Sequence, residues 1–446
     1  MPKGSFRGGI HPPENKSFTG GLPVVPARQP SRVLMLLNTA SGSPLTPMVA
    51  KGDKVLRGQR VADTEARFGV PVHSSISGTV TGIGPVRTCG GNIDTAIIIE
   101  PDGNDTLHES CVPLKNVESM SRNEIIAAVR DAGIVGMGGA QFPTHIKLSV
   151  PPDAKVDTLL LNGAECEPYL TSDHRLMVER PADVIRGAQI LMRALDVRRC
   201  AIGIEDNKPD AVAALVGAAS NAPGVEVVPV RTRYPQGSEK HLIKSAVGRE
   251  VAPGCLPFHA GVVVSNVGTA VAVADKFDRG LPLIERVVTI TGSAVAVPAN
   301  IMMKIGTPAS DLVDQCGGVK GELGKVIFGG PMMGMAVCGL DVPTNKGTSG
   351  ILLLNRAEAR AAEPQACIRC GRCIEACPMG LEPALLHQWA ERKLWAEAEA
   401  YHAVDCIECG ACTYVCPSKR NLVQAIKHAK FEIGCIKRAA KERGGK

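Results

Sequence analysis

Residues 367–378 read CIRCGRCIEACP, and residues 406–417 read CIECGACTYVCP. Both runs match C-x2-C-x2-C-x3-C-P, in which three closely spaced thiolates bind one [4Fe–4S] cluster and the fourth thiolate binds the neighbouring cluster. The pattern therefore predicts a domain that holds two such clusters. One cluster is expected to take Cys367, Cys370, Cys373 and Cys416, and the other Cys406, Cys409, Cys412 and Cys377.

The alternative metal for this segment is zinc, because CxxC pairs also form structural zinc sites. A zinc ion takes four ligands, which gives no reason for a duplicated three-plus-one run that ends each time in proline. Iron–sulfur clusters are therefore favoured. Between the runs, residues 381–405 are rich in Ala, Leu, Glu and Trp at helical spacing, so we expect a helical cluster domain within a larger enzyme.

Length and composition restrict the class of protein. The chain has 446 residues, long enough for about three domains, and its 44% hydrophobic and 21% charged residues are ordinary for a globular protein. No apolar run approaches the roughly 20 residues of a transmembrane helix, and the polar N-terminus does not resemble a secretory signal. We therefore expect folding in the cytoplasm, where the eight cysteines outside the two runs are ordinary small residues rather than disulfide partners.

The net charge of +6 is concentrated at the C-terminus, where nine Lys or Arg and two Glu occur from Lys419 onward. Such a tail suits a solvated helix face, an acidic partner or an anionic membrane surface. Nucleic acid is not expected as a partner, because aromatic residues do not alternate with the basic ones as base stacking requires.

A glycine-rich loop follows a predicted helix in the first half of the chain. Ser121 and Glu124 form a capping box at the start of that helix, Gly133 stops it, and the loop reads GIVGMGGAQFPTHIK. Glycines let the backbone approach a ligand, and a lysine neutralises phosphate. The spacing fits neither a Walker A loop nor a dinucleotide GxGxxG motif, so a purely structural loop is the alternative. The residues concerned are Gly136, Gly138, Gly139 and Lys147.

An apolar strand at residues 158–161 leads into the sequence NGAECEP, which carries Asn162, Glu165 and Glu167. In open α/β sheets, ligands bind at the carboxyl ends of the strands. These side chains are therefore candidates for contacts to flavin or ribose hydroxyls, with a solvated loop as the alternative. Further apolar strands alternate with helices, which predicts a parallel sheet. They lie near residues 200–204, 225–230 and 261–264.

Four motifs carry a resemblance to a known family: GMGGAxFPTxxK from Gly136, NxxExEP from Asn162, YPxGxE from Tyr234 and SNVGT from Ser265. They resemble the NADH-binding flavoprotein subunit of respiratory complex I. They are still more similar to the C subunits of the Rnf complex, a membrane-bound, ion-coupled ferredoxin:NAD+ oxidoreductase. The resemblance covers nearly the whole chain, and implies electron transfer between NAD(H), a non-covalently bound FMN and two [4Fe–4S] clusters.

The resemblance also implies roles for individual residues. FMN would be held by Gly136, Gly138, Gly139, Lys147 and Asn162. The nicotinamide and flavin site would be lined by Glu165, Glu167, Tyr234, Gly237 and Glu239. The FMN phosphate would meet Asn266 and Thr269. No catalytic acid or base is expected, because flavin itself connects two-electron and one-electron transfer.

The expected fold is multidomain, α/β plus β. Its parts are a barrel-sandwich hybrid of the biotinyl/lipoyl type (1–112), a Rossmann-like FMN/NADH domain (113–280), an SLBB β-grasp domain (281–345), a helical two-cluster ferredoxin domain (355–430) and a basic tail (431–446). The barrel lacks a Met-Lys-Met turn, so no attached lipoate is expected. The paired methionines Met302-Met303 and Met332-Met333 are expected to fill cores.

The implied partners are the membrane and iron–sulfur subunits of the Rnf complex, NAD(H) and, indirectly, ferredoxin. The implied location is peripheral, on the cytoplasmic face of the cell inner membrane. Two alternative functions are less favoured. A passive two-cluster relay without flavin would leave the glycine-rich loop and the acidic residues without a task. A reductase of another acceptor, such as a corrinoid, is disfavoured by the N-terminal barrel.

Overall fold

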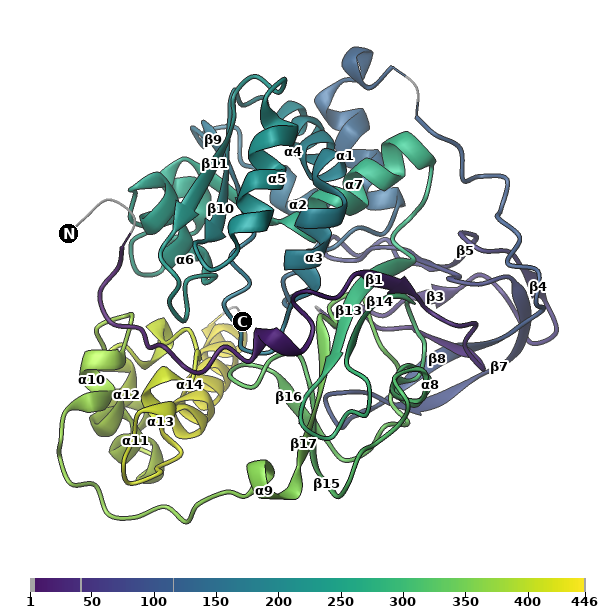
Figure 1. Cartoon of the computed structure of the whole chain (residues 1–446). Helices are drawn as coiled ribbons and strands as arrows, with labels where there is room; N and C mark the ends of the chain where they lie inside the picture. The colour runs from purple at the N-terminus through teal and green to yellow at the C-terminus, as the bar shows by residue number, and fades with distance from the viewer. Residues whose placement is uncertain (1–4, 41, 115, 445–446) are drawn as a thin grey trace.

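The computed structural model describes residues 5–40, 42–114 and 116–444. A four-stranded parallel sheet occupies the upper part of Figure 1. Its order is β11 (Val225–Val230), β10 (Arg199–Glu205), β9 (Thr158–Asn162) and β12 (Val262–Asn266). The central strand β9 is covered on both faces, and Leu159, Leu160 and Leu161 are fully buried. The predicted Rossmann-like sheet is therefore confirmed.

Helices pack on both faces of this sheet, and the capping box predicted for the first of them is present. The Ser121 hydroxyl accepts the N–H of Glu124, whose carboxylate accepts the N–H of Ser121. Helices α4 and α7 cross so closely that a Cβ on Gly187 would collide with the carbonyl of Ala270. The helices are α1 (Arg122–Asp131), α2 (Thr144–Leu148), α3 (Ser172–Glu179), α4 (Pro181–Leu195), α5 (Pro209–Ala219), α6 (Glu239–Leu242) and α7 (Val267–Arg279).

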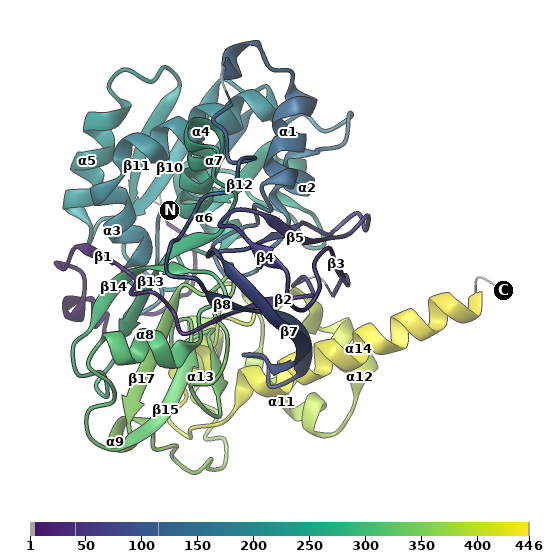
Figure 2. The same cartoon turned by 90° about the vertical axis from the view of Figure 1, so that its right-hand side faces the viewer.

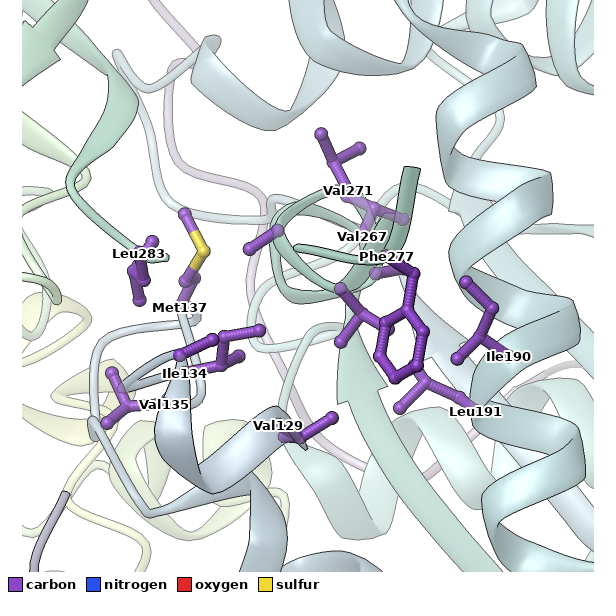
Figure 3. Packing of buried hydrophobic residues seen from close by; sticks show 14 of the residues in the cluster. Val129, Ile134, Val135, Met137, Ile190, Leu191, Val267, Val271, Phe277 and Leu283 are labelled. Carbon is purple, nitrogen blue, oxygen red and sulfur yellow. The ribbon is translucent and has the colours of Figure 1, made fainter. Parts of the chain in front are cut away.

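The glycine-rich loop between α1 and α2 is anchored by apolar packing. Figure 3 shows Ile134, Val135 and Met137 of the loop on one side of the cluster, with Val267 and Phe277 of α7 on the other. All of these side chains are buried. The loop therefore keeps a fixed position relative to the sheet.

Two small antiparallel sheets form the N-terminal barrel-sandwich region. Their inward-facing side chains include Val33, Val61, Val80 and Ile97, none of which is exposed. One sheet contains β2 (Val33–Leu36), β8 (Ile93–Pro101), β7 (Gly78–Arg87) and β4 (Lys54–Val55), in that order. The other contains β3 (Thr46–Pro47), β5 (Arg60–Asp63) and β6 (Val72–His73).

A six-stranded sheet forms the β-grasp region and is larger than the sequence led us to expect. Two of its strands come from outside residues 281–345: β1 pairs with β14, and β17 pairs with β13, both in parallel. Helix α8 (Ala309–Gln315) covers the sheet. The strand order is β1 (Val24–Pro26), β14 (Ala299–Lys304), β13 (Glu285–Thr291), β17 (Gly350–Asn355), β15 (Leu323–Phe328) and β16 (Met335–Val337).

The cluster domain is helical, as the sequence predicts. Helix α14 runs without a break through position 431, where the basic tail was expected to begin. In Figure 2 its C-terminal part projects away from the rest of the chain. None of the described helices is both long and apolar enough to cross a membrane. The helices are α10 (Arg372–Ala376), α11 (Pro383–Glu391), α12 (Trp395–Ala400), α13 (Ala411–Tyr414) and α14 (Leu422–Gly444).

Residues 5–20, here called the N-terminal segment, connect three of these regions. The N–H of Gly9 donates to the carbonyl of Ala376 in the cluster domain (2.9 Å). Ile10 and Tyr234 exchange two main-chain hydrogen bonds beside the parallel sheet (2.8 and 2.9 Å). The carbonyl of Thr19 accepts from Nδ2 of Asn300 in β14 (3.0 Å). In Figure 1 the segment is the purple trace that passes the cluster domain before it reaches β1.

Candidate functional site

A cavity of about 650 Å³, here called the large cavity, lies where the carboxyl ends of β9 and β12 face the loops of the six-stranded sheet. Pockets for small ligands and cofactors commonly measure about 300–1,000 Å³. Asn162 and Asn266, the last residues of the two strands, are partners across the sheet. Predicted site residues that line the cavity are Gly138, Gly139, Asn162, Glu165, Glu167, Tyr234, Gly237, Glu239 and Asn266.

Two glycines of the loop leave bare backbone at the cavity. A Cβ on Gly139 would have no atom within 4 Å, and one on Gly138 would approach only the Asn266 side chain, at 3.8 Å. Gly139 has φ +110°, which side chains of L-residues rarely allow. This open strip of peptide groups fits a flat cofactor such as FMN, because a ring can lie directly against it.

Gly136 and Thr269 do not line the cavity but hold the loop from behind. Gly136 donates its N–H to the carbonyl of Phe142 (2.8 Å). The fully buried Thr269 hydroxyl accepts the N–H of Met137 (3.0 Å). Thr269 therefore anchors the glycine-rich loop, and its contact with the FMN phosphate stays a prediction.

Lys147, also outside the cavity lining, pairs with a residue that lines it. Its ammonium lies 2.8 Å from Oε1 of Glu239, and both side chains are half-exposed. The two residues come from α2 and α6, and were assigned separate roles from the sequence. The ion pair brings them together at one side of the large cavity.

The loop after β9 (residues 163–171), here called the β9 loop, carries Glu165 with its carboxylate at the start of α3. The carboxylate accepts the N–H groups of Asp173 (2.7 Å) and His174 (3.1 Å). Asp173, which the sequence did not single out, also lines the cavity and accepts from Nδ2 of Asn266 (2.7 Å). Burial, reinforced by the Glu165 carboxylate, raises the pKa of Asp173 to about 6.

Glu167 reaches across to the six-stranded sheet. Its carboxylate accepts the N–H groups of Met332 (3.0 Å) and Met333 (2.8 Å). Burial raises the pKa of Glu167 to about 7, while these two hydrogen bonds lower it by a smaller amount. The carboxyl group therefore titrates near neutral pH.

The far wall of the cavity comes from the β-grasp region, which the sequence did not connect with the site. Met333 was expected in a core, but its side chain is 57% exposed and lines the cavity. The contacts of Glu167 explain this position, because they turn the 329–335 loop toward the β9 loop. The wall is formed by Phe328, Gly329, Gly330, Met333, Gly334, Met335, Asn345, Gly347, Thr348 and Ser349.

Tyr234 links the large cavity to the cluster domain. Its hydroxyl donates to the carbonyl oxygen of Cys409 (2.7 Å), and the side chain is almost fully buried. Nδ2 of Asn162 donates to the carbonyl of Gly237 (2.8 Å), which holds the YPQGSE segment at the end of β9. The motifs that begin at Asn162 and Tyr234 therefore form one wall.

A second, smaller cavity, here called the inner cavity, lies within the cluster domain and is lined by Cys377, Cys406, Cys409 and Cys412. These are three cysteines of the second run and the last cysteine of the first, the same set that the spacing predicts. Burial raises the pKa of Cys409 to about 11 and that of Cys412 to about 12. Metal binding would displace these thiol protons.

The other four predicted ligands lie closer to the surface. Cys367 and Cys370 are exposed, whereas Cys373 and Cys416 are half-buried beside Leu422. In the described parts of the chain, no three His, Cys, Asp or Glu side chains converge on a single metal-ion position. The donors in both sets are thiols, which suit iron–sulfur clusters.

Four family models match successive parts of the chain. They describe an RnfC barrel sandwich hybrid domain (4–104), a Nuo51 FMN-binding domain (129–275), an SLBB domain (287–336) and a 4Fe-4S dicluster domain (366–420). The order of these models agrees with the expected order of folds.

Whole-chain comparisons agree with the family models. The chain is 47% identical to the C subunit of the Na(+)-translocating ferredoxin:NAD(+) oxidoreductase complex of Acetobacterium woodii, over 96% of this chain and 97% of that protein. It is 47% identical to the C subunit of the proton-translocating complex of Clostridium ljungdahlii, over 98% and 95%. An NAD+-reducing [NiFe]-hydrogenase in the H2-reduced state shares the fold at 19% identity, with a TM-score of 0.50 over 75% of this chain and 69% of that one.

Proposed function

Because the chain belongs to the family of C subunits of ion-translocating ferredoxin:NAD+ oxidoreductase complexes, we propose that it passes electrons between NAD(H), a bound FMN and two [4Fe–4S] clusters. The observation that carries the proposal is a shared wall: Ile407 lines both the large cavity and the inner cavity. A flavin in the large cavity and a cluster in the inner cavity would be separated by this side chain. Such a short separation suits direct electron transfer.

The chain's own part in the reaction is to bind and orient. The backbone at Gly138 and Gly139 would support FMN, with Asn162 and Asn266 at the strand ends beside it. Lys147, which pairs with Glu239 at one side of the cavity, would turn its ammonium group toward the phosphate of bound FMN. Bound FMN supplies the conversion between hydride transfer and one-electron transfer.

NAD(H) would occupy the remaining space between the β9 loop and the loops of the six-stranded sheet. The Glu165 and Glu167 carboxylates, both fixed by main-chain N–H groups, would orient its nicotinamide and ribose. Tyr234 would close the end of this space nearest the clusters. No side chain has to donate or accept a proton from substrate in this scheme.

The inner cluster would be held by Cys377, Cys406, Cys409 and Cys412, and the outer cluster by Cys367, Cys370, Cys373 and Cys416. The exposed outer set would exchange electrons with other subunits of the complex, and through them with ferredoxin. The chain would attach peripherally to the cytoplasmic face of the inner membrane by contacts with those subunits.

The proposal is tested with full-length protein reconstituted with iron, sulfide and FMN. We expect tight, non-covalent uptake of FMN, bleaching of flavin and cluster absorbance by NADH, and two cluster signals in low-temperature EPR spectra. Replacement of Gly138 by Val should lower FMN content while iron content stays intact, because the added side chain would fill the open space over the backbone where FMN is expected to lie. Protein that carries both clusters but takes up no FMN would instead be a passive relay.

A further inference from the structure

Residues 14–19 of the N-terminal segment lie against the β9 loop. The N–H of Tyr169 donates to the carbonyl of Glu14 (2.8 Å), and the ring of Tyr169 stacks on Phe18. The hydroxyls of Thr19 and Thr171 are 2.6 Å apart and buried. Part of the support of the β9 loop therefore comes from residues 14–19, outside the 129–275 region matched by the FMN-binding model.

Lys16 is at the centre of this contact. Its Nζ donates to three main-chain carbonyls of the β9 loop, those of Glu165 (2.8 Å), Glu167 (3.1 Å) and Leu170 (2.5 Å). Three acceptors require three N–H donors, which only the charged form of lysine has. The geometry therefore describes an ammonium ion.

The charge of Lys16 lies directly behind the wall of the large cavity, because Glu165, Glu167 and Leu170 all line it. Burial lowers the pKa of Lys16, and the Glu165 carboxylate opposes that effect. Its three hydrogen-bond acceptors are neutral carbonyl groups. By contrast, the nearby buried Lys208 ammonium is paired with the Glu205 carboxylate (3.2 Å).

Lys16 is partly buried. A positive charge in such a place stabilises whichever state of a neighbouring redox cofactor is more negative, since water screens the interaction less than it does at an exposed position. Reduction makes a flavin more negative. The hydrogen bonds of Lys16 also span a stretch in which Glu165 and Tyr169 have positive φ (47° and 69°), a backbone conformation that costs energy for residues other than glycine.

We propose that Lys16 is a positioning residue of the flavin site: its charge raises the reduction potential of the bound flavin, and its hydrogen bonds fix the β9 loop. This inference rests on the proposed function, because it requires flavin in the large cavity.

The test compares four variants of the full-length, reconstituted protein. Lys16→Met and Lys16→Gln remove the charge, and Lys16→Arg keeps it. Thr19→Val removes a neighbouring hydrogen bond between the same two segments without changing charge. The flavin midpoint potential is measured by spectroelectrochemical titration, and amide hydrogen exchange of residues 163–171 is measured in flavin-free protein.

We expect the neutral Lys16 variants to shift the flavin equilibrium at least tenfold toward the oxidised form, about 30 mV for a two-electron couple. In Lys16→Arg and Thr19→Val, the flavin redox equilibrium should differ less than threefold from that of the unchanged protein. Exchange in the β9 loop should accelerate about tenfold in Lys16→Met and less in Lys16→Arg.

Two results would overturn the inference. One is a flavin redox equilibrium in Lys16→Met and Lys16→Gln that differs less than threefold from that of the unchanged protein. The other is loss of FMN from Lys16→Gln at normal iron content, because the residue would then be needed for occupancy and not for potential. Absence of FMN from the unchanged protein would contradict the proposed function instead.

Discussion

The two cysteine runs have the same spacing and the same local backbone but opposite surroundings. Gly371 and Gly410, in corresponding positions, both have φ 77°. Their neighbours differ: Ile368 is 67% exposed, whereas its counterpart Ile407 lies between the inner cavity and the large cavity. The repeated local sequence therefore builds two similar ligand loops, and only their place in the fold distinguishes them.

This difference teaches how a duplicated motif acquires two roles. The second run is placed against the flavin domain by Tyr234, whose hydroxyl bonds to the carbonyl of Cys409. The first run leaves Cys367 and Cys370 exposed. We therefore expect electrons to pass between flavin and the inner cluster, and between the outer cluster and other proteins.

The largest expected effect comes from removing one cysteine ligand of the inner cluster or of the outer cluster. Cys409→Ser should abolish the inner [4Fe–4S] signal and stop NADH from reducing the outer cluster, while the flavin is still reduced. Cys370→Ser should abolish the outer signal and leave flavin and inner cluster reducible by NADH. EPR spectra after NADH addition check both outcomes, and failure of inner-cluster reduction in Cys370→Ser would reverse the assignment.

The next effect concerns the pH dependence of stability at Glu167, which lines the large cavity. Burial raises the pKa of Glu167 from 4.5 to about 7, so its contribution to stability is fully present below 4.5 and is lost as pH rises through about 7. A shift of this size corresponds to roughly 3 kcal/mol at most. Glu167→Gln should therefore flatten the pH dependence of thermal stability between about pH 5 and 8, which melting curves detect because ~1 kcal/mol moves the melting temperature by a few degrees. Glu375→Gln, an exposed control beside the outer run, should leave that dependence unchanged.

A smaller effect is expected at the paired isoleucines. Ile407→Ala should lower the free energy of unfolding by roughly 1–2 kcal/mol, because a half-buried side chain between two cavities is truncated. Ile368→Ala should change it by less than about 0.5 kcal/mol, as for most exposed positions. Thermal melting of both variants at equal cluster content gives the comparison, and equal losses would mean that the two runs are buried alike.

The smallest difference is expected at the paired glycines. Alanine at either position costs about 1 kcal/mol, because the left-handed backbone disfavours a Cβ. Gly410→Ala should cost a few tenths of a kcal/mol more than Gly371→Ala, since its Cβ would lie 3.2 Å from the carbonyl of Met332 while that of Gly371 meets no atom within 4 Å. Equal melting temperatures of the two variants would show that the contact between the added Cβ and the Met332 carbonyl has no measurable cost.

Features with a local signal could be predicted from the sequence. The strands of the parallel sheet, the helical cluster domain and the four cysteines around the inner cavity all follow from spacing or apolar pattern within a few dozen residues. The convergence of Asn162 and Asn266 followed from a general rule about strand ends and from motif resemblance.

Features that depend on distant partners could not be predicted. Met333 lines the cavity because Glu167 binds its N–H across 166 positions of sequence, and no local pattern announces that pairing. Lys16 reaches the β9 loop across similar separations. The motif resemblance assigns Thr269 to the FMN phosphate, but only the structure shows that its hydroxyl also accepts the N–H of Met137.

The N-terminal segment has a consequence for biogenesis. It is synthesised before its partners, yet the main-chain group that binds Gly9 belongs to Ala376, and the amide that binds Thr19 is 281 positions away, in Asn300. Contacts of such separation form late, because the intervening chain must be ordered first. Residues 5–20 are therefore translated before these partners but reach their final position after them, once the flavin and cluster domains have formed.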